Sequence, residues 1–224
     1  MLSYHSEQSI KDKYIGRMDA HIKADELIRG IGYENGKGCA VGCTLNNYSH
    51  SRYPIELGMP IWLARLEDKL FEGMSLKKSK TFPLEFLEAI KPGVDLEKVK
   101  GPFLIIILKY TLNKFDHIKY PNVLKSVNTV IDLYEAGETD PEKFREARAA
   151  ADAAYAADDA AAYAADAAAY AADAAAYAAA DAAYADADAA ADAADAAAYA
   201  AADARTKAYD YFADELLRLL RECN

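Results

Sequence analysis

Residues 149–204 read AAADAAYAADDAAAYAADAAAYAADAAAYAAADAAYADADAAADAADAAAYAAADA, a stretch of 56 residues made of 39 Ala, 11 Asp and 6 Tyr. Ala has the highest helix propensity of all residues. The stretch holds no Gly, Pro or Ser that would end a helix. The sequence therefore predicts an all-α protein that contains a long alanine-rich helix or helical hairpin.

Asp and Tyr recur along this stretch with the period of a straight α-helix. From Asp152 to Asp203 a regular series of Asp recurs at about 3.6 residues per turn, and Tyr repeats nearly in step. One unbroken helix would be about 84 Å long. The alternative is a hairpin that turns between residues 186 and 195, where Asp is dense and can cap a helix. Small alanine side chains let helices approach closely, so we expect a coil that assembles the chain into a homo-oligomer.

The net charge of −10 is confined to the alanine-rich stretch. Its 11 Asp belong to the 36 acidic residues of the chain, so the other 168 residues carry 25 acidic and 26 basic side chains. Along an unbroken helix the charges would lie about 7.6 Å apart, more than fourfold sparser than the one per about 1.7 Å of duplex DNA. This spacing argues against nucleic-acid mimicry, and we expect no nucleic-acid partner.

The apolar and cysteine content indicates a cytoplasmic protein. The longest apolar run, residues 103–108, is too short to cross a bilayer, and no charged-then-apolar leader is seen, so we expect no membrane partner. The chain has three Cys, an odd number, and Cys39 and Cys43 lie four residues apart. This usage is typical of a reduced compartment.

Glycine and proline divide the rest of the chain into expected helices. The expected helical ranges are 7–29, 60–73 with Pro60 at the first helical position, 83–90, 103–114, 122–135 and one that starts after Thr139, with an amphipathic end at 209–220. A strand is the alternative around Ile105–Ile107. Trp62, Arg65, Glu67 and Asp68 are expected on an exposed helix face with surface ion pairs. We predict a helical module at 1–138 with a Gly/Cys-rich loop, and an alanine-rich tail at 139–224.

The loop Gly36-Lys37-Gly38-Cys39-Ala40-Val41-Gly42-Cys43-Thr44 holds the candidate ligand-binding residues. A glycine-rich turn that leads into a short helix at Cys39 would present backbone N–H groups to an anion and lower a thiol pKa. The spacing does not match a P-loop. The candidate ligand-binding residues are Lys37, Gly38, Cys39, Cys43 and Thr44.

The same loop also suggests two other kinds of site. In a cysteine-dependent enzyme Cys39 would be the nucleophile and His21 the base, with Asp25 or Glu56 as the orienting carboxylate. Alternatively, both cysteines are small buried residues, and His21 and Asp25 form a structural pair on the apolar face of the first helix. Cys39, Cys43, His50 and either His5 or His21 could supply zinc ligands, but their spacing is not a strong zinc signature. We therefore predict no metal and no cofactor.

The run from Gly36 to Thr44, with residues 56–68 after it, resembles a group of uncharacterised bacterial and phage proteins that carry an alanine-rich helical tail. The resemblance covers nearly the whole chain and implies no activity. It favours a role for His21, Lys37, Cys39 and Cys43. The tail of this chain, with only Tyr and Asp among its alanines, departs from the Trp- and Arg-bearing tails of that group.

These observations favour a binding protein over an enzyme. We expect a cytosolic protein that binds a small anionic or nucleotide-like ligand at the Gly/Lys/Cys loop, in a phage–host defence context, and that assembles through the alanine-rich coil. The alternatives are a Cys39/His21-dependent enzyme and a structural or interaction protein that acts through its acidic tail.

Overall fold

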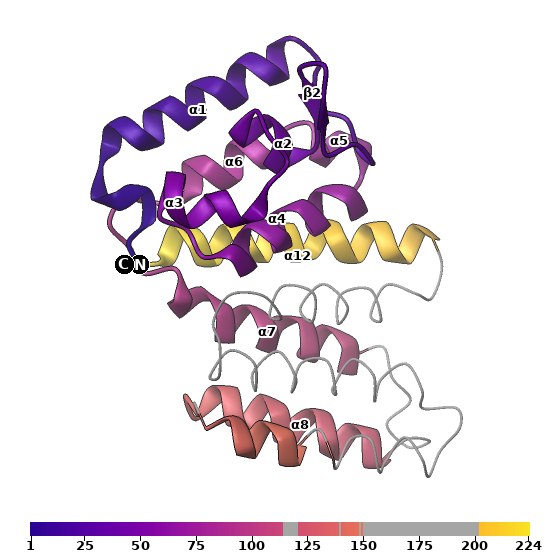
Figure 1. The fold of residues 1–224 in the computed structure, drawn as a ribbon. Helices are drawn as coiled ribbons and strands as arrows, with labels where there is room; N and C mark the ends of the chain where they lie inside the picture. Colours follow the sequence, from indigo (N-terminus) through magenta and orange to yellow (C-terminus); the bar gives the residue numbers. More distant parts are fainter. Residues whose placement is uncertain (114–120, 139, 148, 150–201) are drawn as a thin grey trace. The chain divides into compact units, whose positions relative to one another are not determined.

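The chain folds as helices with one minimal hairpin, as the computed structural model in Figure 1 shows. The model describes residues 1–113, 121–138, 140–147, 149 and 202–224. Within these residues the elements are η1 (Ser3–Ser6), α1 (Gln8–Lys23), β1 (Tyr33–Glu34), β2 (Lys37–Gly38), α2 (Ala40–Leu45), η2 (His50–Arg52), α3 (Tyr53–Leu57), α4 (Ile61–Gly73), α5 (Leu76–Ser79), α6 (Phe82–Ala89), α7 (Glu97–Leu112), α8 (Pro121–Glu135) and α12 (Ala202–Glu222). The predicted all-α class is confirmed for this part of the chain.

The contacts divide the chain into two compact units. The first unit comprises Met1–Val99 together with Tyr209–Asn224, and the second comprises Lys100–Ala208. The boundary that the sequence suggests, between residues 138 and 139, lies inside the second unit. Because the chain returns to the first unit at Tyr209, the part of α12 from Tyr209 onward belongs with the N-terminal elements.

Helix α4 supplies much of the core of the first unit. Leu63, Leu66 and Leu70 are fully buried, and the helix ends at Gly73, as predicted. Pro60, which was expected at the first helical position, has an extended backbone and is the N-cap, so the helix begins one residue later. Leu63, Leu66 and Leu70 repeat at three- and four-residue intervals and form one apolar face, which is the pattern that buries a helix on one side.

Helix α12 closes this core, as its predicted amphipathic end requires. Its buried residues are Tyr209, Phe212, Ala213, Leu216, Leu217 and Leu220. The Tyr209 ring lies against Gly73, where a Cβ atom would come within 2.5–2.6 Å of ring carbons. Asp210 also accepts a hydrogen bond from the Ser75 backbone N–H at 2.9 Å. The expectation that residues 209–220 anchor the end of the tail is therefore confirmed.

Helix α1 is shorter than predicted. It begins at Gln8 and ends at Lys23, whereas the sequence pattern suggested that it continues to Arg29. The chain leaves the helix at Ala24, and Asp25 takes a left-handed conformation with φ of 53°. A residue in this conformation cannot continue a right-handed helix, and Asp tolerates the conformation better than most residues do. The helix therefore ends before Gly30.

The second unit has its own apolar cluster. Leu108 and Leu112 of α7 pack with Val127, Val130 and Ile131 of α8, and Ala147 joins them. Residues 105–107 lie in a helix, so the alternative of a strand is wrong. Residues 141–147 are helical, and the Asp140 carboxylate accepts from the Glu142 backbone N–H at 3.0 Å, as a helix cap does. The helix start predicted after Thr139 is thus confirmed.

The alanine-rich stretch lies almost wholly outside the described residues. The straight helix that its Asp and Tyr spacing indicates, the length of that helix and the alternative of a hairpin therefore stay predictions. Among the described helices none is long and apolar enough to cross a membrane.

Candidate functional site

The Gly/Lys/Cys loop is a tight β-hairpin followed by a short helix. Tyr33 pairs with Gly38 and Glu34 with Lys37, and two residues connect the strands. These are Asn35 and Gly36, with φ of 52° and 83°. Two consecutive positive φ values define the type I′ turn that fits the twist of a hairpin, and Asn-Gly is its preferred sequence. The segment around Lys37 is therefore a hairpin strand and does not form a phosphate-binding loop.

Two glycines of the loop allow a close backbone contact. A Cβ atom at Gly38 would lie 2.3 Å from the Gly32 carbonyl oxygen, and one at Gly42 would lie 1.8 Å from it. The Cys39 backbone N–H donates to the Ile31 and Gly32 carbonyls at 2.8 and 3.1 Å. The absence of side chains at Gly38 and Gly42 thus lets the hairpin pack directly on α2.

Cys39 begins α2, as predicted, but its thiol pKa is raised. Its Sγ accepts from the Gly42 backbone N–H at 3.4 Å, which alone would lower the pKa. Burial raises the pKa of Cys39, and the Asp68 carboxylate beside it raises the pKa further. Burial likewise raises the pKa of Cys43 to about 12. The expectation of a lowered thiol pKa is wrong, because burial outweighs the helix N-terminus.

Four of the five candidate ligand-binding residues are buried. Gly38, Cys39, Cys43 and Thr44 are covered by neighbouring residues, and Lys37 is exposed. Of this set only Lys37 can therefore touch a ligand in the described conformation. The four buried residues lie under the surface and support it.

The candidate catalytic residues have separate partners. The His21 ring lies with Nδ1 2.6 Å from Glu26 Oε2 and Nε2 2.8 Å from Asn46 Oδ1. Asp25 is exposed and faces Lys80 at 3.9 Å, so His21 and Asp25 do not form the expected pair. The reason is the early end of α1, which turns Asp25 away from the helix face that carries His21.

Glu56, the alternative orienting carboxylate, has other partners than Cys39 and His21. Its Oε2 accepts from the Tyr14 hydroxyl, and its Oε1 lies 2.5 Å from Arg52 Nη2. The Cys39 thiol instead lies near the Asp68 carboxylate, whose charge raises the pKa of Cys39. In the described residues the expected nucleophile Cys39 and base His21 thus have different partners from each other. The expected carboxylates, those of Asp25 and Glu56, pair with other side chains.

A buried carboxylate that the sequence placed on the surface organises the site. Asp68 Oδ2 accepts from the Tyr48 hydroxyl at 2.9 Å and lies 3.1 Å from His50 Nε2. Burial raises the pKa of Asp68, but the hydrogen bonds from His50, Cys39 and Tyr48 outweigh it, so the pKa lies below its ordinary value. We call Cys39, Tyr48, His50 and Asp68 the Asp68 cluster. It ties α2, the loop after α2 and α4 together around one negative charge.

Glu67, next to Asp68, is fully buried, and Trp62 and Asp68 are buried as well, so the expectation that these three lie on an exposed helix face is wrong. Its Oε2 accepts from the Tyr53 hydroxyl at 2.5 Å, while its buried Oε1 has no hydrogen-bond partner among the described residues. Burial raises the pKa of Glu67 to about 8; the Tyr53 hydroxyl lowers it and the Asp68 charge raises it. Glu67 is therefore mostly protonated at neutral pH. Four residues after Leu63 and three before Leu70, it lies on the apolar face of α4, a signal that the sequence contains.

Tyr48 is the member of the Asp68 cluster that reaches the surface. It is 49% exposed, and its ring centroid lies 5.1 Å from that of His50 in an edge arrangement. The ring rests over Gly32, where a Cβ atom would lie 2.5 Å from the Tyr48 Cγ. Burial and the nearby Asp68 raise the pKa of the Tyr48 hydroxyl, which therefore stays a donor. Sequence reasoning missed Tyr48 because its partners come from other elements.

The described residues contain no group of three or more His, Cys, Asp and Glu side chains close enough to hold a metal ion. His50 lies with Asp68, and His5 Nε2 lies 3.0 Å from the Ile55 carbonyl oxygen. No family model, curated protein or solved structure matches the chain.

Proposed function

We propose that the chain is a binding protein for a small anionic, nucleotide-like ligand, held on the surface of the hairpin and α2. The observation that carries the proposal is the half-exposed Tyr48 ring, which is fixed at its hydroxyl by Asp68 and supported by Gly32 and His50. A ring fixed before binding loses little side-chain entropy when a ligand stacks on it. Stacking of a base on such a ring is worth about 1–3 kcal/mol.

Lys37 supports the anionic part of this proposal. It is exposed on β2, directly before Gly38, and Gly38 packs on Gly32 beneath the Tyr48 ring. A lysine ammonium binds a phosphate as a point charge. Glu34 stands opposite Lys37 in the hairpin register, so its carboxylate opposes an anion there. The ligand would thus place its ring on Tyr48 and its anion at Lys37.

Isothermal titration of adenosine monophosphate into the full chain tests this function. Tyr48→Ala removes the stacking surface and Lys37→Ala removes the cation, so each should weaken binding at least about tenfold, or about 1.4 kcal/mol. Glu34→Gln should strengthen it, because the opposing charge is lost. Tyr211→Ala on α12, where the side chain is 41% exposed, and Lys23→Ala, which breaks a surface pair with Asp19, are the matched controls.

The binding proposal fails if this nucleotide shows no saturable binding, or if Tyr48→Ala and Lys37→Ala bind it as the wild type does. Equal losses in the two control variants would also contradict it, since those side chains lie on other elements. No observation in the described residues favours the cysteine-dependent enzyme, because the Cys39 thiol is 1% exposed and its pKa is raised.

Assembly through the alanine-rich coil and the phage–host defence context belong to the same proposal. They are supported by the composition of residues 149–204 and by the resemblance of the loop. Removing the chain after Pro141 would also remove α12 from the first unit, so the better perturbation replaces the six tyrosines of the stretch with serine. Light scattering should show an oligomer for the wild-type chain and a smaller species for this variant. A monomeric wild type would contradict the coil as an interface.

A further inference from the structure

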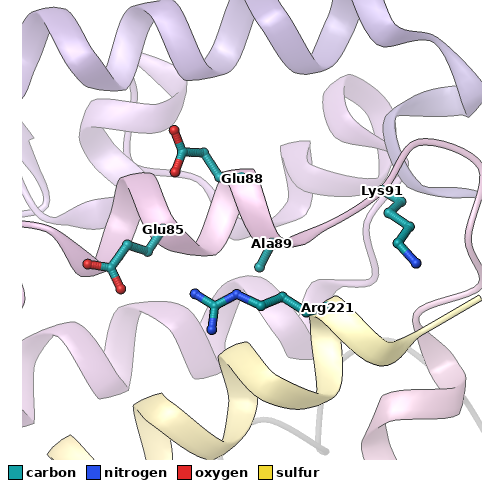
Figure 2. A pocket seen from close by; sticks show the side chains of 5 residues that line it. All are labelled: Glu85, Glu88, Ala89, Lys91 and Arg221. Atoms are coloured by element: carbon teal, nitrogen blue, oxygen red, sulfur yellow. The ribbon is translucent and has the colours of Figure 1, made fainter.

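A concave surface that is separate from the Asp68 cluster lies between α6 and the C-terminal end of α12. It is an open hollow of about 300 Å³, lined by Glu85, Glu88, Ala89, Lys91 and Arg221 (Figure 2). Helix α6 and the part of α12 from Tyr209 onward belong to the first unit. Contacts at the end of the chain hold its rim: Lys91 Nζ donates to Asn224 Oδ1 at 2.7 Å, and Lys98 Nζ donates to the Asn224 carbonyl oxygen at 3.0 Å.

The hollow contains a guanidinium that has no partner in the described part of the chain. Figure 2 shows the Arg221 side chain extending from α12 beneath α6, on the side where Glu85 lies. One turn earlier, Arg218 pairs with both Glu215 and Glu222 at 2.7–3.0 Å. The neighbouring carboxylates on α12 are therefore engaged by Arg218. Within the described residues Arg221 makes no ion pair, although two carboxylates line the same hollow.

The carboxylates of the hollow also lack ion pairs in the described residues. Glu85 and Glu88 stand one turn apart on α6 and line the same opening. Lys11 lies near Glu88, but its Nζ donates to the backbone carbonyls of Glu88 and Ile90 at 2.7 and 2.8 Å. Figure 2 shows the Glu85 carboxylate on the side of α6 where Arg221 lies, whereas the Glu88 carboxylate points to the opposite side of α6. The hollow therefore presents one carboxylate, Glu85, and one guanidinium, Arg221, with the Lys91 ammonium held at its edge by Asn224.

We propose that this hollow binds a small zwitterion of the α-amino acid class, independently of the nucleotide-like ligand. The charges of Glu85 and Arg221 sum to zero, which matches a ligand with one cation and one anion. The ligand ammonium lies toward Glu85, and its carboxylate pairs with Arg221, whose planar fork suits a carboxylate. The volume is at the lower end of the range for ligand pockets, and Ala89 leaves room only for a short side chain.

Nuclear magnetic resonance titration of the labelled full chain with L-alanine tests this site. Alanine should shift the amide signals around Ala89 and Arg221 in a saturable way. N-acetylalanine, which lacks the cation, and alaninamide, which lacks the anion, should each bind at least tenfold more weakly. Arg221→Gln and Glu85→Gln should weaken alanine binding to the same extent. Ala89→Leu, which fills the hollow without a change of charge, should abolish it.

The matched control is Arg218→Gln, which removes a guanidinium on the same helix that is already paired. It should leave alanine binding unchanged. The proposal is overturned if alanine causes no saturable shifts at millimolar concentrations, if the two blocked analogues bind as alanine does, or if Arg218→Gln weakens binding as much as Arg221→Gln. Because the probe carries neither a base nor a phosphate, none of these results depends on the Tyr48 site.

Discussion

The buried carboxyl of Glu67 makes the stability of the first unit depend on pH in a predictable direction. Its pKa is about 8 in the folded chain and returns to about 4.5 on unfolding. Between these values the folded state holds a proton that the unfolded state releases, so stability falls as the pH rises from 4.5 to 8. At about 1.4 kcal/mol per pH unit, this lowers the free energy of unfolding by roughly 3 kcal/mol at pH 7 and by roughly 4–5 kcal/mol above pH 8.

Glu67→Gln removes this dependence, because an amide stays neutral at every pH. Its oxygen can accept from the Tyr53 hydroxyl as Glu67 does at 2.5 Å, although the buried amide N–H groups need partners of their own. We expect the variant to exceed the wild type by roughly 2–4 kcal/mol at pH 8 and to differ by less than about 1 kcal/mol at pH 5.

Urea denaturation at pH 5, 7 and 8 measures this effect. The fluorescence of Trp62, the single tryptophan, reports on the first unit because the ring is buried there. Glu34→Gln makes the same Glu-to-Gln change at an exposed hairpin position and serves as the control. Parallel pH profiles for the wild type and Glu67→Gln would refute the reasoning, since the carboxyl would then titrate alike in both states.

Two further predictions follow from the packing. Gly73→Ala should destabilise the first unit by about 1–3 kcal/mol in urea denaturation, because its methyl group would meet the Tyr209 ring at 2.5 Å. Gly16→Ala, in the interior of α1 with no neighbour within 4 Å, should instead stabilise by about 0.5–1 kcal/mol, and the reverse order would contradict the packing. Cys43 should react with iodoacetamide at pH 8 roughly 10³-fold more slowly than free cysteine, because its pKa is about 12. Rapid labelling of the folded chain, followed by mass spectrometry, would contradict its burial.

Helix boundaries were predictable where backbone chemistry determines them. Gly73 ends α4, Gly93 with φ of 84° follows α6, and Gly137 with φ of 67° follows α8. The amphipathic pattern of residues 209–220 also predicted a packed C-terminal helix. The end of α1 was not predictable in this way, because it depends on a left-handed Asp25 where no Gly or Pro is present.

The candidate site was predictable only in its local part. The sequence indicated the short helix at Cys39, and Asn35-Gly36 contained a hairpin signal. The burial of both loop cysteines was the alternative to their expected role in ligand binding. The donors to Asp68 come from residues 18 to 29 positions away along the chain, so no local pattern reveals them. Glu67 and Asp68 were predicted to lie on an exposed face of α4, because the hydrogen-bond partners that compensate for their burial come together only in the folded chain.

The most direct test of the binding function is a map of where a nucleotide contacts the chain. Titration of the isotope-labelled full chain with adenosine monophosphate, followed by amide chemical shifts, gives this map. We predict saturable shifts centred on Gly32, Lys37 and Tyr48, which disappear in Tyr48→Ala. The absence of saturable shifts, or shifts centred on other elements and unchanged in Tyr48→Ala, would contradict the binding function.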